Sequence, residues 1–358
     1  MQHELYMRRC LELSQRGKGL TAPNPMVGAI LVYNDKIIGE GWHHFYGADH
    51  AEINCLRNVK EEDKHLIPES TMYVNLEPCA HYGITPPCST SLVQAHVKQV
   101  IVCNLDPFEK VRGKGIEILK AGGVTVVSGI LTDNGFWVNR RFFCFHKQSR
   151  PYIILKWAKT QDGFIAPNSR QRFQITNNTS NKLVHKWRTE ESAILVGTKT
   201  ALFDNPQLTA RHWSGKQPLR ILLDKTLKIP SNHHLYNNEA ATWIINEKKE
   251  GLQGNIHFIN IVFNESLIAN LLHKLFEHKI VSLIVEGGAE LLNNFINNEL
   301  WDEARVFTGS QLLQEGLVAP ILSNSNFAFQ SQLDGESIQI FVNKDSEYQY
   351  PTAINFEL

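Results

Sequence analysis

The pattern of apolar and polar positions changes period repeatedly along the first 130 residues, and this predicts a layered α/β domain. Apolar residues at helical spacing predict helices over 4–16, 50–58, 88–97 and 115–121. Short apolar stretches predict strands at 27–33, 36–41, 71–75, 100–103 and 124–127. Only Asn34-Asp35 separates the first two strands, which indicates a hairpin turn.

A second series of strands and helices begins after Pro151. The segment FFCFHKQSRP, residues 142–151, ends in this proline and leads into a new apolar strand at 152–158. We therefore expect two domains, 1–147 and 148–358. In the second domain, strands are predicted at 193–196, 219–223, 242–245 and 282–285, and helices at 179–188, 266–276 and 289–297. We also expect strands after residue 320.

Composition narrows the class of protein mainly by exclusion. The chain has 358 residues, and Lys+Arg and Asp+Glu both number 36, so no overall basic charge points to nucleic acid. No apolar run approaches the roughly 18 residues that span a membrane, and the amino terminus lacks a signal peptide's apolar core. Six cysteines in a chain this long do not form a disulfide framework. These features predict a cytoplasmic protein that binds neither nucleic acid nor membrane.

Three short motifs together resemble one zinc site. They are His50-Ala51-Glu52, Pro78-Cys79 and Pro86-Pro87-Cys88. One imidazole and two thiolates leave the fourth corner of a tetrahedral zinc ion open for water. Zinc lowers the pKa of that water, and Glu52 is placed to carry protons without being a ligand. Zinc nucleobase deaminases share this division of labour in an H-x-E…P-C-x-x-C pattern, but here eight residues separate the cysteines.

Other assignments of these residues stay open at this point. A structural zinc site would need a fourth ligand, for which His81 is the nearest candidate. Asn24 lies between two prolines and could present its amide to the edge of a flat heterocycle. His43 and His81 are further candidates, although a single histidine is as often a hydrogen-bonded structural residue. The remaining cysteines, Cys10, Cys55, Cys103 and Cys144, are predicted to fill apolar space.

Longer motifs extend the comparison to nearly the whole chain. TAPNPMVGAILV, GWHHFYGADHAE and NLEPCAHYGITPPC resemble the deaminase half of the bifunctional riboflavin-biosynthesis deaminase-reductase family. Its reductase half is similar to LKWAKTQDGFIA, HKWRTEESAILVGTKTALFDNPQLTAR and LIVEGGAELLNNF. The family also shows the eight-residue gap between the cysteines. The resemblance implies a cytidine-deaminase-like α/β/α domain followed by a dihydrofolate-reductase-like α/β domain.

The resemblance also implies two consecutive reactions and a set of residues for each. Zinc hydroxide would remove the 2-amino group of 2,5-diamino-6-ribosylamino-4(3H)-pyrimidinone 5′-phosphate, and NADPH would then reduce the ribosyl chain to ribityl. In the deaminase half, His50, Cys79 and Cys88 match the zinc ligands, Glu52 the proton shuttle, and Asn24, His43 and His81 substrate positions. A homo-oligomer acting on this phosphorylated pyrimidine is expected.

For the reductase half, the resemblance assigns cofactor and substrate positions that no ordinary dinucleotide fingerprint would reveal, since no G-x-G-x-x-G follows the strand at 152. The cofactor positions are Ala158, Gln174, Thr200, Asp204, Gly287 and Gly288. The substrate positions are Arg172, Arg188, Leu208, Arg211 and Glu286, and both Arg188 and Arg211 suit a phosphate because guanidinium pairs it through two nitrogens. Lys156 is expected near the centre of hydride transfer.

Two positions depart from the family's pattern. Ile84 stands where the family commonly has Arg or Lys between the cysteines, and we hypothesise that Arg112 or Lys114 supplies the missing cation. Gln174 stands where an aromatic residue often lies against the cofactor, which raises the question of NADPH versus NADH preference.

Two rival functions are weighed against this assignment. A nucleic-acid base deaminase would show a basic face and stacking aromatics, and neutral net charge argues against it. In a non-enzymatic protein, zinc would only stabilise the fold, and the second half would sense a ligand.

Overall fold

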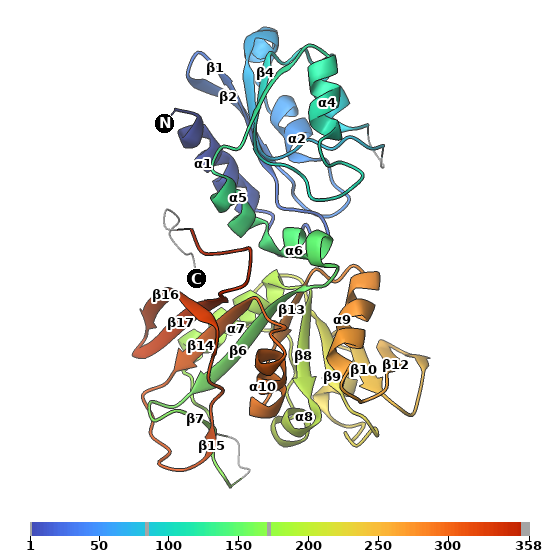
Figure 1. Ribbon diagram of the computed structural model, residues 1–358, viewed down its shortest axis with the longest axis vertical. Coiled ribbons are helices and arrows are strands. Elements are labelled where there is room, and N and C mark those ends of the chain that lie inside the picture. Colours follow the sequence, from blue (N-terminus) through green and yellow to red (C-terminus); the bar gives the residue numbers. More distant parts are fainter. Residues whose placement is uncertain (1, 83–85, 170–172, 352–358) are drawn as a thin grey trace. The chain divides into compact units, whose positions relative to one another are not determined.

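The computed structural model describes residues 2–82, 86–169 and 173–351 (Figure 1). Ile84 and Arg172 therefore lie outside the described residues. The chain divides into two compact units, of which the first ends at Gln148 and the second begins at Ser149. No helix in the described ranges is both long and apolar enough to cross a membrane.

The first unit is built on a five-stranded sheet in the order β2-β1-β3-β4-β5. Its strands are β1 (Gly28–Tyr33), β2 (Lys36–Trp42), β3 (Thr71–Leu76), β4 (Gln99–Asn104) and β5 (Thr125–Ser128). β1 is antiparallel to both β2 and β3, whereas β3, β4 and β5 are parallel. Asn34 and Asp35 have φ values of 42° and 62°, the left-handed pair that a two-residue hairpin turn requires, so the predicted hairpin is confirmed.

Helices cover both faces of this sheet because successive strand residues point to opposite sides. The helices are α1 (Gln2–Gln15), α2 (Ala51–Arg57), α3 (Cys88–Gln94), α4 (Lys114–Ala121), α5 (Thr132–Val138) and α6 (Arg140–Gln148), with a 3-10 helix at Glu61–Glu69. Leu31 of β1 belongs to the same apolar cluster as Cys55 of α2, and its neighbour Ile30 to the cluster that contains Met7 of α1. The predicted α/β/α layering is confirmed.

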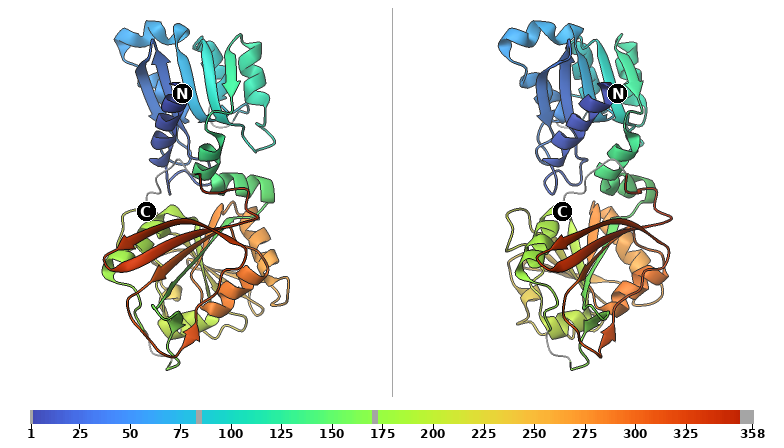
Figure 2. Two further views of the ribbon diagram at one scale, coloured as in Figure 1. Left: turned by 60° about the vertical axis from the view of Figure 1, so that its left-hand side comes forward. Right: turned by 90° about the vertical axis from the view of Figure 1, so that its left-hand side faces the viewer.

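The second unit contains a ten-stranded sheet in the order β11-β12-β10-β9-β8-β13-β6-β14-β17-β16. Its strands are β6 (Tyr152–Lys159), β8 (Ala193–Gly197), β9 (Leu219–Leu223), β10 (Thr242–Asn246), β11 (Gly251–Gln253), β12 (Ile256–Asn260), β13 (Ser282–Val285), β14 (Glu303–Thr308), β16 (Ser325–Leu333) and β17 (Glu336–Asn343). All neighbours from β12 to β14 are parallel. The antiparallel β16–β17 hairpin forms one edge (red in Figure 2).

The remaining elements of the second unit connect these parallel strands. They are α7 (Asn178–Glu190), α8 (Thr198–Asp204), α9 (Leu267–Glu277), α10 (Ala289–Asn297), a 3-10 helix at His234–Tyr236, and a small separate ladder of β7 (Phe164–Ala166) with β15 (Leu317–Val318). One large core cluster runs through β6, β8, β9 and β13 to α9 and α10. Helices that follow parallel strands in this way bury the sheet, as the α/β pattern predicts.

Most predicted elements are present within a few residues, and the expected strands after residue 320 are β16 and β17. The sequence analysis missed α5, α6, α8, β14 and the short strands β7, β11, β12 and β15. The segment 142–151, which we expected to be a connection, instead belongs largely to α6.

Candidate functional site

The structure brings His50, Cys79 and Cys88 together beyond the carboxyl end of β3, the central strand of the first unit's sheet. His50 is the residue before α2, Cys79 lies in the turn after β3, and Cys88 is the first residue of α3. Their donor atoms all lie within 4.8 Å of one another. Nδ1 of His50 is 3.5 Å from Sγ of Cys79 and 3.3 Å from Sγ of Cys88, so Nδ1 is the nitrogen that faces the sulfurs. An imidazole and two thiolates in this arrangement suit zinc.

No fourth His, Cys, Asp or Glu joins this group among the residues that the structure describes. His81, the candidate for a fourth ligand, is exposed, and its ring lies edge-on to Phe108 at 6.0 Å between centroids. A closed structural zinc site therefore lacks its fourth ligand in the described part of the chain. A three-ligand set leaves a coordination position for a water molecule.

Hydrogen bonds between the two cysteine segments hold the sulfurs in place. The backbone N–H of Cys88 donates to Sγ of Cys79 at 3.2 Å. Ser89 donates to the carbonyl oxygen of Cys79 through both its N–H, at 3.2 Å, and its hydroxyl, at 2.9 Å. The start of α3 is thus tied to the Cys79 turn, which pre-organises two of the three ligands.

The electrostatics favour a thiolate at this position. Hydrogen bonds from Cys88 and His50 stabilise the Cys79 thiolate and lower the pKa of Cys79 to about 4. The hydrogen bond to Cys79 also accounts for the pKa of Cys88, which is raised, and for that of His50, which is raised to about 9. Thiolate is the form of cysteine that binds a metal.

Glu52 lies beside the ligands but is not one of them. It occupies the first turn of α2, is 3% exposed and is within hydrogen-bonding reach of Cys88. Burial raises the pKa of Glu52 to about 7. A carboxyl group whose pKa lies near neutrality can both accept and donate a proton, which is what a general acid-base catalyst requires.

Asn24 and His43 form a hydrogen-bonded pair next to His50. Nδ1 of His43 lies 3.0 Å from the carbonyl oxygen of Asp49, which can only accept, so Nδ1 carries the hydrogen. Nε2 of His43 then accepts from Nδ2 of Asn24 at 3.2 Å. The His43 ring is 2% exposed, lies 5.4 Å from that of His50, and has its pKa lowered by burial, so it stays neutral. This bond orients the Asn24 amide.

Glu77, which the sequence analysis did not single out, is also part of this site. It precedes the Pro78-Cys79 turn, is 3% exposed, and accepts backbone hydrogen bonds from the loop between β4 and α4. An acidic residue beside a metal ligand is the only sequence signal it gives, and that signal does not reveal its partners.

In the second unit, a buried charge cluster contains two predicted substrate residues. Nε and Nη2 of Arg188, on α7, donate to the two carboxylate oxygens of Glu286 at 3.1 and 2.8 Å, and Nη1 donates to the carbonyl oxygen of Thr209 at 3.0 Å. The two-nitrogen fork of Arg188 is therefore directed at Glu286, where we had expected a phosphate.

Lys156 completes the cluster from the middle of β6. Burial lowers the pKa of Lys156, while the neighbouring Glu286 opposes that shift. Burial would raise the pKa of Glu286, but Arg188 and Lys156 outweigh it and lower the pKa to about 2. His185, buried on the same helix as Arg188, has a pKa lowered to about 4 by burial and by Arg188. Glu286 is thus a buried anion whose charge is balanced by the neighbouring cations Arg188 and Lys156.

The predicted cofactor residues are placed around the ends of β6, β8 and β13. The N–H of Gly288, the residue before α10, donates to the Thr200 hydroxyl of α8 at 2.9 Å, so these two loops are joined. A Cβ atom at Gly287 would come within 2.8 Å of the Leu291 side chain. Ala158 is half-buried on β6, and Asp204 ends α8 and is exposed.

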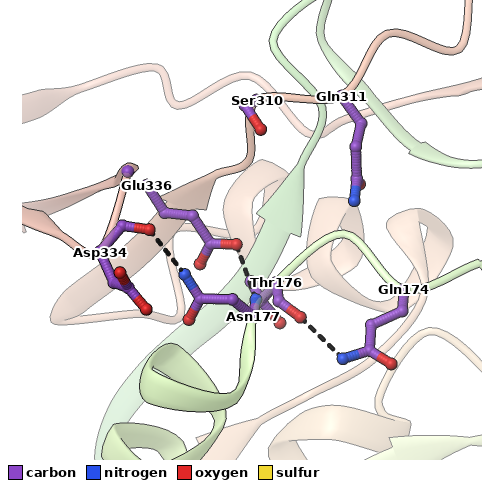
Figure 3. Close-up of a pocket in the computed structure, with 8 residues that line it drawn as sticks. Gln174, Thr176, Asn177, Ser310, Gln311, Asp334 and Glu336 are labelled. Carbon is purple, nitrogen blue, oxygen red and sulfur yellow. Dashed lines mark hydrogen bonds between the residues drawn. The ribbon is translucent and has the colours of Figure 1, made fainter.

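The other predicted reductase residues differ in exposure. Leu208 is 2% exposed with a φ of 55°, and Arg211 is exposed. Gln174 lines a cavity of about 370 Å³ together with Thr176, Asn177, Ser310, Gln311, Asp334, Gly335 and Glu336 (Figure 3). Its side-chain amide donates to the carbonyl oxygen of Thr176 at 3.0 Å. The lining side chains are mostly polar, and no described cation is among them.

Comparisons with known proteins agree with this geometry. Residues 1–104 match the cytidine and deoxycytidylate deaminase zinc-binding region, and residues 151–328 match the RibD C-terminal domain. The chain is 39% identical to riboflavin biosynthesis protein RibD of Aquifex aeolicus, over 87% of this chain and 88% of that one. It is 32% identical to RibD of Escherichia coli strain K12, over 87% and 89%.

Solved structures that contain both domains are also similar to this chain. Acinetobacter baumannii RibD superimposes with a TM-score of 0.86 at 31% identity, covering 95% of this chain and 98% of that one. A diaminohydroxyphosphoribosylaminopyrimidine deaminase/5-amino-6-(5-phosphoribosylamino)uracil reductase from Thermotoga maritima gives 0.87 at 29% identity, covering 96% and 99%. The predicted fold class, a deaminase-like domain followed by a reductase domain, is confirmed.

Proposed function

Because this chain belongs to the RibD family of bifunctional deaminase-reductases of riboflavin biosynthesis, we propose that its first unit deaminates 2,5-diamino-6-ribosylamino-4(3H)-pyrimidinone 5′-phosphate with zinc. We propose further that its second unit reduces the ribosyl chain of the product to ribityl with NADPH. The convergence of His50, Cys79 and Cys88, with Glu52 buried beside them, is the observation that carries the deaminase half.

In the deaminase unit, residues of the chain would bind the zinc ion and move protons. His50, Cys79 and Cys88 would hold the zinc ion, which supplies an activated water when bound. Glu52 takes a proton from the attacking water and gives it to the adjacent ring nitrogen. The carboxylate of Glu52 then takes the proton of the new hydroxyl group and passes it to the amine, so that the carbonyl forms as the carbon–nitrogen bond breaks and ammonia departs. Asn24, whose amide is hydrogen-bonded to His43, would pair with the edge of the pyrimidine ring, and this bond supports that role.

In the reductase unit the buried charge cluster supports a proton-coupled reduction. Hydride transfer to the sugar carbon breaks that carbon's bond to the ring oxygen, and this oxygen needs a proton. Lys156 is a buried ammonium with a lowered pKa beside Glu286, so it suits the role of proton donor. Arg188 keeps Glu286 ionised and fixed in orientation. The Thr200–Gly288 junction at the start of α10 supports cofactor binding, because helix starts favour phosphate.

A product analysis tests both halves together. The purified, zinc-loaded chain would be mixed with the diaminopyrimidinone phosphate, with and without NADPH, and the products identified by mass. We expect exchange of an amino group for oxygen without NADPH, and a further gain of two hydrogens with it. Unchanged substrate in both mixtures would refute the proposed function.

Cofactor choice gives a prediction that concerns Gln174. Because this side chain is exposed and its amide is bonded to Thr176, it offers a cofactor little aromatic surface. We expect Gln174→Trp to tighten NADPH binding about 5- to 10-fold, because a stacked aromatic contact contributes on the order of 1 kcal/mol. Titration of NADPH and NADH against both proteins, followed by nicotinamide fluorescence, measures the change. Equal affinities in the two proteins would remove Gln174 from the cofactor site.

Acid sensitivity gives a prediction that concerns Glu286. Its pKa is about 2 in the folded chain against 4.5 ordinarily, so its contribution to stability is complete above about pH 4.5 and is lost as the pH falls towards 2. At pH 7, Glu286→Gln should lower the free energy of unfolding by on the order of 3 kcal/mol, because Arg188 is left buried without its partner. Urea denaturation of both proteins at several pH values checks this. The difference between them should shrink from pH 4.5 downwards, and a constant difference would contradict the assignment.

A further inference from the structure

Glu77 connects the metal-ligand turn to backbone groups 29 to 39 positions further along the chain. Its carboxylate accepts hydrogen bonds from four backbone N–H groups, those of Asp106 at 3.2 Å, Gly113 at 3.0 Å, Gly115 at 3.0 Å and Ile116 at 3.4 Å. No cation pairs with it among the described residues. A buried carboxylate satisfied by N–H groups alone fixes the backbone that supplies them.

The same loop touches the ligand turn directly. A Cβ atom at Gly115 would lie 2.0 Å from the carbonyl oxygen of Pro78, so only glycine allows this approach of the two backbones. Gly113 has a φ of 82°, which also favours glycine. Because Pro78 is bonded to Cys79, the segment from Arg112 to Gly115 is held beside a predicted metal ligand.

This segment carries two cations with no anionic partner. Arg112 and Lys114 flank Gly113, both are exposed, and neither has an ion pair within the ranges that the structure describes. We call Arg112–Gly115 the cationic turn.

Three other cations of the first unit have partners elsewhere. Arg57 pairs with Asp49, Arg16 stacks on Trp42 at 4.8 Å, and Lys110 lies 5.9 Å from the centre of the Phe108 ring. The cationic turn thus carries two exposed cations beside the ligand turn that have no ion-pair partner among the described residues.

The start of helix α4 does not itself bind an anion here, because Glu77 already accepts the N–H groups of Gly113, Gly115 and Ile116. An anion at this place would have to be bound by side chains. Guanidinium and ammonium groups bind phosphate strongly through charge-assisted hydrogen bonds. The position between the cysteines that could otherwise supply a cation is Ile84 in this chain.

We propose that Arg112 and Lys114 bind the 5′-phosphate of the deaminase substrate, and that Glu77 is the positioning residue that holds them beside the metal site. This inference rests on the proposed function, since it takes the phosphorylated pyrimidine as the substrate. The cations would come from a turn that Glu77 and the close approach of Gly115 to Pro78 hold against the Pro78-Cys79 turn.

Substrates with and without the phosphate separate this role from general damage. Arg112→Ala, Lys114→Ala and the double variant would be assayed with the phosphorylated pyrimidine and with its dephosphorylated form. We expect KM for the phosphorylated substrate to rise about 10- to 100-fold in the double variant, the range for a lost hydrogen bond to a charged group. The kinetics with the dephosphorylated substrate should stay unchanged. Lys120→Ala, an exposed lysine in the last turn of the same helix, is the matched control and should behave as the wild type.

Glu77→Gln tests the positioning role, because it keeps the size of the side chain but replaces one acceptor oxygen by a donor. We expect KM to rise for the phosphorylated substrate only, with zinc content unchanged. An equal loss with both substrates would assign Glu77 to the folding of the metal site and overturn its positioning role.

The outcomes distinguish this inference from the proposed function. If the zinc-loaded wild type deaminates neither compound, the proposed function fails and this inference fails with it. If the wild type prefers the phosphorylated compound and the double variant keeps the full preference, the cationic turn does not bind the phosphate and only this inference is overturned.

Discussion

Glu52→Gln is expected to abolish most deamination while leaving the metal in place. The amide has the same shape as the carboxyl group but cannot take a proton from water or pass it to the ring. Loss of a general acid-base group costs on the order of 10²–10⁴ in rate, and a group that acts in two successive steps should lie at the upper end. Ammonia release at saturating substrate measures the effect, and atomic absorption measures the zinc.

The second unit provides an internal control for this variant. Reduction of the already deaminated compound by NADPH should proceed at the wild-type rate in Glu52→Gln. A zinc-loaded Glu52→Gln that still deaminates within 10-fold of wild type would show that another group moves the protons. Loss of zinc together with activity would make Glu52 a support of the ligands instead.

Lys156→Met should reduce the turnover of the reductase about 10²- to 10⁴-fold, because it removes the proposed proton donor. Methionine keeps an unbranched apolar chain in the same space, so packing on β6 is largely preserved. NADPH oxidation with the deaminated substrate measures the loss, and ammonia release by the first unit should be unaffected.

Lys159→Met is the matched control, since Lys159 ends the same strand and points to its opposite face. NADPH affinity should be similar in all three proteins, because Lys156 is expected to act on the sugar oxygen. If both lysine variants reduce the substrate at wild-type rates, proton donation must be assigned to another group.

The layered folds were predictable because the spacing of apolar residues within each short segment indicates a helix or a strand. Strands 219–223 and 282–285 and helix 289–297 appear with the predicted bounds. Strand β14 was missed because Glu303 and Arg305 suggest an exposed segment, whereas both are buried and pair with each other at 2.7 Å. Helix α6 was missed because its segment leads into Pro151 and so suggested a connection between the domains, whereas Phe142, Phe143 and Phe145 are all buried.

The features of the candidate sites also differ in whether a short stretch of sequence could predict them. The group of candidate zinc ligands could be predicted because each motif lies within a few residues and zinc has few coordination patterns. The Arg188–Glu286 pair could not be predicted, since 98 residues separate its members and each was assigned to the substrate alone. The four bonds of Glu77 were equally inaccessible, because they go to backbone groups, which every residue has.

Cys10, Cys55, Cys103 and Cys144 are all buried, as expected for residues that fill apolar space, whereas Cys79 is partly accessible and has a pKa of about 4. A thiol-alkylating dye applied to the folded chain at neutral pH should therefore label Cys79 long before it labels these four buried cysteines. Coordination would shield that sulfur, so the labelling rate becomes a direct gauge of how much of a preparation carries its metal.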